Sequence, residues 1–442
     1  MAFITLGCRV NQCETDMLYR AGKRAGYRQA KSGETADVVV FNTCSVTGES
    51  ERQARQAIRR AVREHPGARI VVTGCYAQRD PEGLARIPGV SLILGNDGKE
   101  DLFAVLANQR PDPAEADRPL PVRSEAGEFS LPGLTESGVQ DRARAYLHVQ
   151  NGCDAGCTFC VIPALRGASR SAHLEQVIIQ AKELLAHGFQ ELVLMGINLG
   201  SYGRDLPSPV SLTRLIGTLL PLPGLGRLRL SSIAPQDLDP AFFAEVLAEP
   251  RFCPHLHLSI QSGDDLILKH MRRPYTRAQL LHVIHTIRAR RPEIVLGADI
   301  IVGFPTEDEA AFVNTLELLQ EGQIALPHIF RYSDRPGTPA ARIPSHLRPS
   351  PELVRERAER LRIATQVILG DVLARTVGHE LQVLVESVTQ GHARGKTGEF
   401  LPLVFPAMDI DLVGKLVSVQ VARVDLPNMG LVGKCGDADH EI

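Results

Sequence analysis

Short apolar runs alternate with helical patterns through the first hundred residues. Three of these runs predict strands, at residues 3–6, 38–41 and 70–73. Helical patterns follow them at residues 14–25 and 48–64, and a weaker one follows Asp80. Strands that alternate with helices are typical of a parallel sheet. The sequence therefore predicts an α/β fold whose first part is a parallel α/β sheet domain.

The same alternation returns from Tyr146 onward. Six candidate strands follow one another, at residues 146–150, 192–196, 227–232, 255–260, 296–302 and 327–332. Helical segments separate them, for example at residues 174–187 and 307–321. Six such units predict a partial (β/α)6 barrel. By analogy with complete barrels, functional residues are expected at the carboxyl ends of its strands.

The regions outside these two series differ in character. Residues 109–140 are polar, charged and interrupted by prolines, which predicts a linker. A charged helix is expected at residues 352–375. Short strands after it predict a small β-barrel, at residues 379–387, 397–404 and 414–424. The predicted parts are an N-terminal domain (1–108), a linker (109–140), a barrel core (141–371) and a small β-barrel (372–442).

Composition and charge restrict the class of protein. A length of 442 residues predicts two to three domains, and 44% hydrophobic with 23% charged residues is typical of a soluble globular protein. No signal peptide or apolar run of about 18 residues is evident, so we expect a cytoplasmic protein without a membrane span. The net charge of −2 gives no general indication of a nucleic-acid partner. Nine cysteines in such a chain favour metal ligands over disulfides.

Three cysteines lie close together in the sequence, at Cys153, Cys157 and Cys160. Thiolates are the ligands of iron–sulfur clusters, and three of them within eight residues can hold one four-iron cube. The fourth iron then stays open to bind a small molecule. A structural zinc site would need a fourth protein ligand, and none lies nearby. The spacing therefore favours a [4Fe-4S] cluster over zinc or a disulfide.

A second group of three cysteines is scattered along the N-terminal part. Cys8, Cys44 and Cys75 each follow one of the first three predicted strands. The carboxyl ends of parallel strands line one edge of a sheet, so these thiols are expected to meet in space. We interpret them as ligands of a second cluster, and buried structural cysteines are the alternative. Cys13, Cys253 and Cys435 fall outside both sets and are expected to be dispensable.

Taken together, these features resemble the radical S-adenosylmethionine (SAM) methylthiotransferase family over essentially the whole chain. The matching segments are residues 5–11, 42–47, 73–75, 152–160, 162–163, 166–171, 258–263, 271–276, 299–305 and 332–341. The resemblance implies a methylthiotransferase domain, a radical SAM core and a C-terminal TRAM domain. It also implies SAM and two [4Fe-4S] clusters as cofactors. In this family the cluster on the closely spaced cysteines binds SAM, and the other cluster holds a sulfur atom.

The reaction implied by the resemblance replaces hydrogen at C2 of an adenine ring with a methylthio group. Residues 6–11, followed by Glu14, resemble the branch that modifies N6-threonylcarbamoyladenosine at position 37 of tRNA, next to the anticodon. The N6-isopentenyladenosine branch typically begins with tyrosine–glycine–cysteine–glutamine instead. The branch that modifies a ribosomal-protein aspartate usually lacks the Gln-Ser-Gly sequence found here at 261–263. A non-catalytic zinc-bearing RNA-binding protein is the alternative from a different class.

Further candidate site residues follow from the resemblance, from positions on strands and from side-chain chemistry. Met195, Gly196 and Asn198 resemble the segment that contacts SAM, while Gln261 and Asp299 are candidates for contacts to SAM or substrate or for structural hydrogen bonds. Two arginines, Arg166 and Arg170, either bind a carboxylate or phosphate or are solvated surface residues. The expected partners are tRNA and an electron donor such as a flavodoxin or ferredoxin system. The sulfur donor is left undefined.

Overall fold

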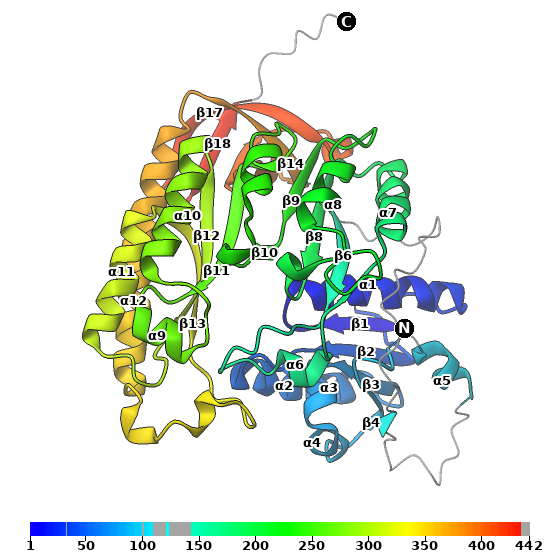
Figure 1. Ribbon diagram of the computed structural model, residues 1–442. Helices are drawn as coiled ribbons and strands as arrows, with labels where there is room; N and C mark the ends of the chain where they lie inside the picture. Colours follow the sequence, from blue (N-terminus) through cyan, green and yellow to red (C-terminus); the bar gives the residue numbers. More distant parts are fainter. Residues whose placement is uncertain (32, 100, 109–120, 123–142, 435–442) are drawn as a thin grey trace, which may run out of the picture. The chain divides into compact units, whose positions relative to one another are not determined.

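The computed structural model describes residues 1–31, 33–99, 101–108, 121–122 and 143–434 (Figure 1). The chain forms two compact units that interleave along the sequence. The first unit contains Met1–Gln140, Gln150–Ala172 and Ser333–Ala341, and the second contains Asp141–Val149, His173–Tyr332 and Arg342–Ile442. The predicted linker at 109–140 lies outside the described residues, apart from 121–122. In the described part of the chain, no helix has the length and apolar character needed to cross a bilayer.

A five-stranded parallel sheet forms the centre of the first unit. Its strands, in spatial order, are β1 (Ala2–Thr5), β2 (Val38–Thr43), β3 (Arg69–Gly74), β4 (Val90–Leu94) and β5 (Pro121–Val122). The accompanying helices are α1 (Arg9–Arg24), α2 (Gly48–Glu64), α3 (Cys75–Arg79), α4 (Pro81–Ala85) and α5 (Leu102–Asn108). The predicted parallel sheet is confirmed. Strands β4 and β5 extend it beyond the three predicted strands.

The two faces of this sheet pack into separate cores. Val39 and Phe41 of β2 belong to one apolar cluster, together with Ile58 of α2. Val38 belongs to a second cluster, together with Leu18 of α1. Side chains of a strand alternate between its faces, so helices cover both sides and β2 is buried along its whole length. A near-continuous apolar run is the sequence pattern that such a strand requires.

The second unit contains most of the predicted barrel. Its strands are β6 (Ala145–Asn151, of which the last two residues belong to the first unit), β8 (Glu191–Gly196), β9 (Arg227–Leu230), β10 (Ser232–Ile233), β11 (His255–Gln261), β12 (Val295–Val302) and β13 (Ile324–Arg331). They form two four-stranded sheets, in the orders β7-β6-β8-β9 and β10-β11-β12-β13. The two-residue strand β7 (Arg170–Ser171) pairs antiparallel with the end of β6. The predicted strand at 227–232 is divided into two at Ser231, where the chain passes from one sheet to the other.

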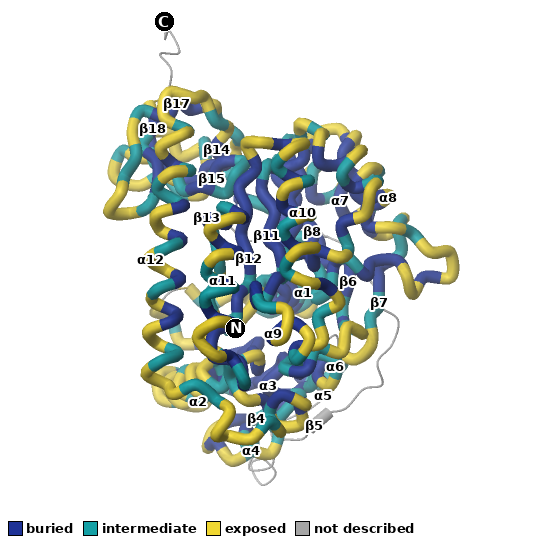
Figure 2. Tube along the Cα trace, turned by 60° about the vertical axis from the view of Figure 1, so that its left-hand side comes forward, coloured by how far each residue is buried: buried dark blue, intermediate teal, exposed yellow. Residues whose placement is uncertain are grey.

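Helices separate these strands as expected. They are α6 (Ile162–Arg166, in the first unit), α7 (Leu174–Ala186), α8 (Leu212–Leu219), α9 (Asp265–His270), α10 (Arg277–Arg290) and α11 (Glu309–Glu321), and α12 (Pro351–Arg375) follows β13. Short 3₁₀ turns lie at Leu199–Ser201, Pro235–Asp237, Ala340–Arg342, Ser345–Leu347 and Ile410–Leu412, and a π-helical turn lies at Phe242–Val246. Figure 2 shows that β11 and β12 are mostly buried, with some half-buried residues in their second halves, whereas burial and exposure alternate along α12. The charged pattern of α12 therefore marks a helix with one solvent-facing side.

A closed five-stranded barrel follows α12, which confirms the predicted small β-barrel. Its strands are β14 (Glu380–Thr389), β15 (His392–Thr397), β16 (Pro402–Pro406), β17 (Leu416–Asp425) and β18 (Gly430–Lys434), in the spatial order β14-β15-β16-β18-β17. The strand predicted at 397–404 is only partly confirmed, because residues 402–404 belong to β16 but residues 398–401 form a turn. Thr397 ends β15 and binds the backbone of Leu401 through two hydrogen bonds, which closes a turn with Phe400 at a φ of 71°. The apolar pair Phe400–Leu401 has the sequence pattern of a strand, although it lies in that turn.

A buried carboxylate fastens the small barrel to the strands of the second unit. Glu191 on β8 accepts hydrogen bonds from Arg227 (2.5 Å) and Arg229 (3.0 Å) on β9. Arg227 also donates to the backbone oxygens of Gln382 and Lys396, and Arg229 donates to those of Thr397 and Gly398. The guanidinium of Arg229 lies 4.9 Å from the centre of the Phe400 ring. The turn that ends β15 is therefore held by charge as well as by packing.

Glu191→Gln is expected to destabilise the second unit. Burial alone would raise the pKa of Glu191, but the surrounding arginines outweigh burial and lower that pKa from 4.5 to about 2. Its charge therefore stabilises the fold above about pH 4.5, and this contribution is lost as the pH falls towards 2. The variant leaves buried arginines without their carboxylate, at a cost of about 3–5 kcal/mol in unfolding free energy near pH 7.

Denaturant unfolding at several pH values would measure both effects. The variant should lose less stability than the parent when the pH falls from about 5 to about 3, because its amide cannot be protonated in that range. Glu352→Gln, on the solvent side of α12, provides a matched control for which no measurable change is expected. Parallel pH curves for the parent and Glu191→Gln would contradict this account.

Candidate metal centre

The first three strands of the N-terminal sheet each lead into a cysteine. Cys8 precedes α1, Cys44 follows the last residue of β2, and Cys75 is the first residue of α3. Since β1, β2 and β3 are parallel neighbours, their carboxyl ends share one edge of the sheet. Burial raises the pKa of the Cys44 thiol to about 11, and the sulfurs of Cys8 and Cys75 add to this rise through their proximity. The three thiols are therefore neighbours.

Two glycines allow these cysteines to approach one another. Gly7 and Gly74 have φ angles of 109° and 97°, which side-chain-bearing residues rarely adopt. A Cβ atom on Gly7 would lie 2.2 Å from the Cβ atom of Cys44. A Cβ atom on Gly74 would lie 2.4 Å from the backbone oxygen of Thr43. A larger residue at either position would push the ends of the strands apart.

Asn11 ties the Cys8 segment to the Cys44 segment. Its Nδ2 atom donates to the backbone oxygens of Leu6 and Thr43, both at 3.0 Å. Its Oδ1 atom lies 3.5 Å from the Sγ atom of Cys8, which donates to it. Asn11 is completely buried in the first turns of α1. This polar residue thus joins the ends of two strands and one of the thiols.

A charged cluster is buried beside the same edge. The side chain of Arg166 is 0% exposed and donates to Oε1 of Glu14 at 2.7 Å, to Oδ1 of Asn11 at 3.0 Å and to Oδ1 of Asn151 at 3.1 Å. Lys99 forms a second ion pair with Glu14. Arg166 was predicted either to bind a carboxylate or phosphate or to be a solvated surface residue. It does bind a carboxylate, which belongs to Glu14 of the same chain. Its interpretation as a solvated surface residue is wrong.

The closely spaced cysteines lie in the first unit as well. Cys153, Cys157 and Cys160 are all half-buried. The backbone N–H groups of Ala155 and Ile162 donate to the sulfurs of Cys153 and Cys160, both at 3.5 Å. The segment therefore presents three accessible thiols that are suited to metal binding.

The segment that follows these cysteines packs against the other cysteine group. Val161 and Leu165 form an apolar cluster with Cys75. Asn96 donates to the backbone oxygen of Leu165 at 2.8 Å and to the sulfur of Cys75 at 3.7 Å. These contacts all lie within the first unit. Both groups of candidate ligands thus belong to one compact body, although 78 positions separate Cys75 from Cys153 in the sequence.

The remaining candidate residues lie in the second unit, on strands or directly after them. Gly196 ends β8, Gln261 ends β11, and Asn198 begins the turn after β8. The Met195 side chain is completely buried, and Gln261 has a φ angle of 76°, an uncommon conformation for a residue other than glycine. Asp299 lies in the middle of β12. Gly196 and Gln261 therefore lie at the carboxyl ends of strands, as predicted for functional residues of a barrel.

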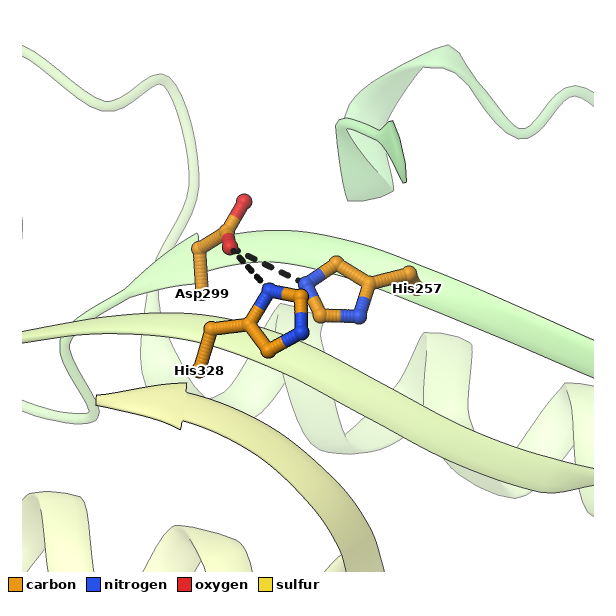
Figure 3. A group of neighbouring side chains, drawn as sticks. All are labelled: His257, Asp299 and His328. Atoms are coloured by element: carbon orange, nitrogen blue, oxygen red, sulfur yellow. Dashed lines mark hydrogen bonds and ion pairs between the residues drawn. The ribbon is translucent and has the colours of Figure 1, made fainter. Parts of the chain in front are cut away.

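Two histidines that the sequence analysis did not single out surround Asp299 (Figure 3). The Oδ1 atom of Asp299 lies 3.0 Å from Nε2 of His257 and 3.4 Å from Nδ1 of His328. Among the described residues, these three have ligand atoms within 4.8 Å of one another, as a site for a single metal ion requires. Lone histidines on strands give no sequence signal for this arrangement, because it depends on the register between strands.

Comparison with known proteins now identifies the family. Residues 1–95 match the uncharacterized protein family UPF0004, and residues 147–319 match the radical SAM superfamily. The chain is 37% identical over 402 residues to the threonylcarbamoyladenosine tRNA methylthiotransferase MtaB of Rickettsia prowazekii. This match covers 90% of each of the two chains. It is 34% identical over 440 residues to the protein of the same name from Bacillus subtilis, covering 97% of this chain and 94% of that one. The chain belongs to the radical SAM methylthiotransferase family.

Other relatives of this methylthiotransferase carry a different substrate in their names. The tRNA-2-methylthio-N(6)-dimethylallyladenosine synthase of a Parafrankia strain is 34% identical over 430 residues, covering 96% of this chain and 85% of that one. Among solved structures, the radical SAM methyltransferase TsrM from Kitasatospora setae has a TM-score of 0.56 at 16% identity, covering 77% of this chain and 73% of that one. That likeness confirms the fold. The methylthiotransferase uses SAM and [4Fe-4S] clusters, as its family requires.

The residues of this methylthiotransferase fit such clusters. Each cysteine group would supply three thiols, which would leave one iron of a cube for another ligand. With its raised pKa, the Cys44 thiol would release a proton on binding a metal at neutral pH. Asn11, within the segment at 6–11, and Glu14 were predicted only as markers of a family branch, and Lys99 was not predicted at all. Their role in holding the Cys8 group has no sequence signal, because polar residues usually indicate a surface.

Asn11→Ala is expected to weaken the Cys8 edge of the methylthiotransferase. The variant loses two hydrogen bonds that join the strand ends, which costs about 2 kcal/mol in unfolding free energy. After cluster reconstitution, it should release iron to a chelator faster than the parent does. Gln56→Ala, at an exposed position on α2, is the matched control. Equal rates of iron release from the parent and Asn11→Ala would show that Asn11 has no such role.

Proposed function

We propose that this methylthiotransferase converts N6-threonylcarbamoyladenosine at position 37 of tRNA to its 2-methylthio derivative. The observation that carries the proposal is the substrate in the names of relatives 32–39% identical to this chain, which cover most of it. The segment at 6–11 supports the same branch. Within it, Gly7 and Asn11 have defined structural roles at the cysteine edge.

Separate roles are proposed for the two cysteine groups. Cys153, Cys157 and Cys160 would hold the cluster that binds SAM, and Cys8, Cys44 and Cys75 would hold the second cluster with its sulfur. The bound cofactors supply radical chemistry, which an unactivated C2–H bond requires because acid–base groups cannot attack it. The chain contributes positions and charges. Arg166 packs beside the Cys8 group and carries a buried positive charge next to its thiols.

A further set of residues is proposed for contacts to SAM and to the nucleoside. Gly196 allows the backbone to approach a ligand, because it has no side chain. Met195, Asn198, Gln261 and Asp299 complete the proposed set of contacts. We place the reaction in the cytoplasm, with tRNA as the substrate and a flavodoxin or ferredoxin system as the electron donor.

Mass spectrometry of modified nucleosides tests the proposal. We would compare tRNA from cells with and without the gene for this protein. The expected result is loss of 2-methylthio-N6-threonylcarbamoyladenosine together with accumulation of its precursor that lacks the methylthio group. Loss of 2-methylthio-N6-dimethylallyladenosine instead would assign the chain to the other branch that its relatives represent. Unchanged tRNA would contradict both assignments and direct attention to a ribosomal-protein substrate.

A further inference from the structure

Three side chains of types that bind metal ions converge on neighbouring strands of the second unit. His257 lies on β11, Asp299 on β12 and His328 on β13, and both rings lie against the same carboxylate oxygen (Figure 3). Asp299 is directly opposite His328 in the strand register, and His257 is opposite Gly297. A Cβ atom at Gly297 would lie 2.5 Å from Nδ1 of His257, so the glycine makes room for that ring. We refer to His257, Asp299 and His328 as the histidine–aspartate group.

The spacing within this group is close to that of ligands around one ion. A transition-metal ion lies about 2.1 Å from an imidazole nitrogen or a carboxylate oxygen, so two such ligands are about 3.0 Å apart at a right angle and about 3.4 Å apart at the tetrahedral angle. The Oδ1 atom of Asp299 lies 3.0 Å from Nε2 of His257 and 3.4 Å from Nδ1 of His328. All three ligand atoms lie within 4.8 Å of one another. An ion among them would therefore require little movement of the side chains.

The chemistry of the three groups suits a cation. Burial acts to raise the pKa of Asp299, but hydrogen bonds from the two histidines outweigh it and hold this pKa well below its ordinary value, so the carboxylate is ionised at neutral pH. A neutral imidazole carries its proton on either ring nitrogen. With the proton on the nitrogen away from Asp299, each ring directs a lone pair towards the carboxylate. The group then offers one anionic ligand and two neutral ones.

The surroundings orient Asp299 and leave the group accessible. The Oγ atom of Ser259 donates to the second carboxylate oxygen, Oδ2, at 3.5 Å. Hydrogen bonds of this kind orient the ligands of metal sites. Alternation along β12 places Ala298 and Ile300, both completely buried, on the opposite face from Asp299. The His328 side chain is 55% exposed, so an ion can reach the group from solvent on that side.

We propose that the histidine–aspartate group binds one divalent first-row transition-metal ion through Nε2 of His257, Oδ1 of Asp299 and Nδ1 of His328. Two imidazoles and one carboxylate suit such ions, whereas magnesium and calcium favour oxygen ligands. Three protein ligands leave at least one position open for water or another small ligand. The site belongs to the second unit, whereas both cysteine groups belong to the first. A contact of Asp299 with SAM or the nucleoside would then be made through the ion.

Manganese binding to the cluster-loaded enzyme tests this proposal. Free Mn²⁺ gives a sharp paramagnetic resonance signal that broadens on binding, and oxidised [4Fe-4S] clusters give none. The parent is expected to bind about one Mn²⁺ per chain and to show nitrogen couplings from imidazole in the pulsed spectrum. His328→Phe should weaken binding by more than about tenfold, because even loss of a residue that only supports a ligand costs about 10- to 100-fold in metal affinity. Asp299→Asn keeps the size of the side chain, removes its charge and should have the same effect.

A control and the iron content keep the result specific. His285→Gln, at an exposed position on α10, should bind Mn²⁺ as the parent does. All four proteins should contain equal amounts of iron, because no cysteine is changed. Zinc that copurifies with the parent and is absent from His328→Phe and Asp299→Asn would support the proposal in the same way.

The opposite results would overturn the metal site. A zinc-free parent that binds no Mn²⁺ at millimolar concentration, or binds it without nitrogen couplings, would leave the histidine–aspartate group as a hydrogen-bonded cluster. Equal Mn²⁺ affinity in the parent, His328→Phe and Asp299→Asn would place the ion elsewhere in the molecule.

Discussion

Cys44→Ser is expected to remove half of the iron from the reconstituted enzyme and to abolish methylthio transfer, while SAM is still cleaved to 5′-deoxyadenosine. Cys44 lies at the centre of the Cys8 group, buried between the ends of neighbouring strands. Serine preserves the size of the side chain but is a poor ligand for iron in a cluster. Cys157→Ser should also remove half of the iron, but it should abolish SAM cleavage as well. The two variants therefore distinguish the function of the Cys8 group from that of the group at Cys153, Cys157 and Cys160.

Iron and sulfide analysis, combined with quantification of 5′-deoxyadenosine and modified nucleoside, would measure these outcomes. Cys13→Ser is the matched control, since Cys13 is buried in α1 and belongs to neither group. It should keep its full iron content and its activity. Loss of a cluster in Cys13→Ser, or full activity in Cys44→Ser, would require a different set of ligands. Zinc without acid-labile sulfide in the parent protein would remove the basis for both cysteine assignments.

Glu14→Gln is expected to have the second large effect, on the stability of the first unit. Glu14 is the shared partner of Arg166 and Lys99, and all three side chains are at most 10% exposed. The amide keeps the size of the carboxylate but leaves two buried cations without their anion. Breaking a buried ion pair in this way typically costs about 3–5 kcal/mol in unfolding free energy. The segment around Cys153 should then become more sensitive to proteolysis, because Arg166 no longer fastens it.

A double-mutant cycle would show whether these charges act together. Arg166→Met in the Glu14→Gln background removes one of the uncompensated cations, so the double variant should be more stable than the sum of the single effects predicts. Denaturant unfolding and limited proteolysis provide the measurements. Glu34→Gln removes the charge from an exposed ion pair with Arg28. This control should leave the unfolding free energy and the sensitivity to proteolysis unchanged. Strictly additive effects would mean that Glu14 and Arg166 stabilise the unit independently.

The parallel sheet and the convergence of Cys8, Cys44 and Cys75 could be predicted because both follow from local patterns. Valine-rich runs indicate buried strands, and a residue directly after such a strand has a known position in any parallel sheet. The start of α1 could not be predicted in the same way. Its first turns contain the buried polar residues Asn11 and Glu14, and the predicted helix begins only at residue 14 instead of Arg9.

Long-range polar contacts account for most of the remaining differences. The partners of Glu14 lie 85 and 152 positions away in the sequence, at Lys99 and Arg166. No local pattern can indicate that a glutamate in a helix meets a lysine and an arginine so far along the chain. The contacts of Asp299 with His257 and His328 also have no local sequence signal, because they depend on the register of three strands. Apolar periodicity identifies elements, whereas buried charges and strand register depend on the completed fold.

The interleaved first unit has a consequence for the order in which the protein is made. Residues up to Gln140 leave the ribosome first, but the unit also requires Gln150–Ala172 and Ser333–Ala341. Arg335 lies in the last of these segments and donates to the carboxylate of Glu51 at 2.8 Å. It also donates, at 3.2 Å, to the backbone oxygen of Ser45, the residue directly after Cys44. Domains usually fold in the order of synthesis. Here the surroundings of Cys44 stay incomplete until residue 341 of 442 has been translated. We therefore expect the Cys44 thiol to be more exposed during that interval than in the folded protein, where it is buried.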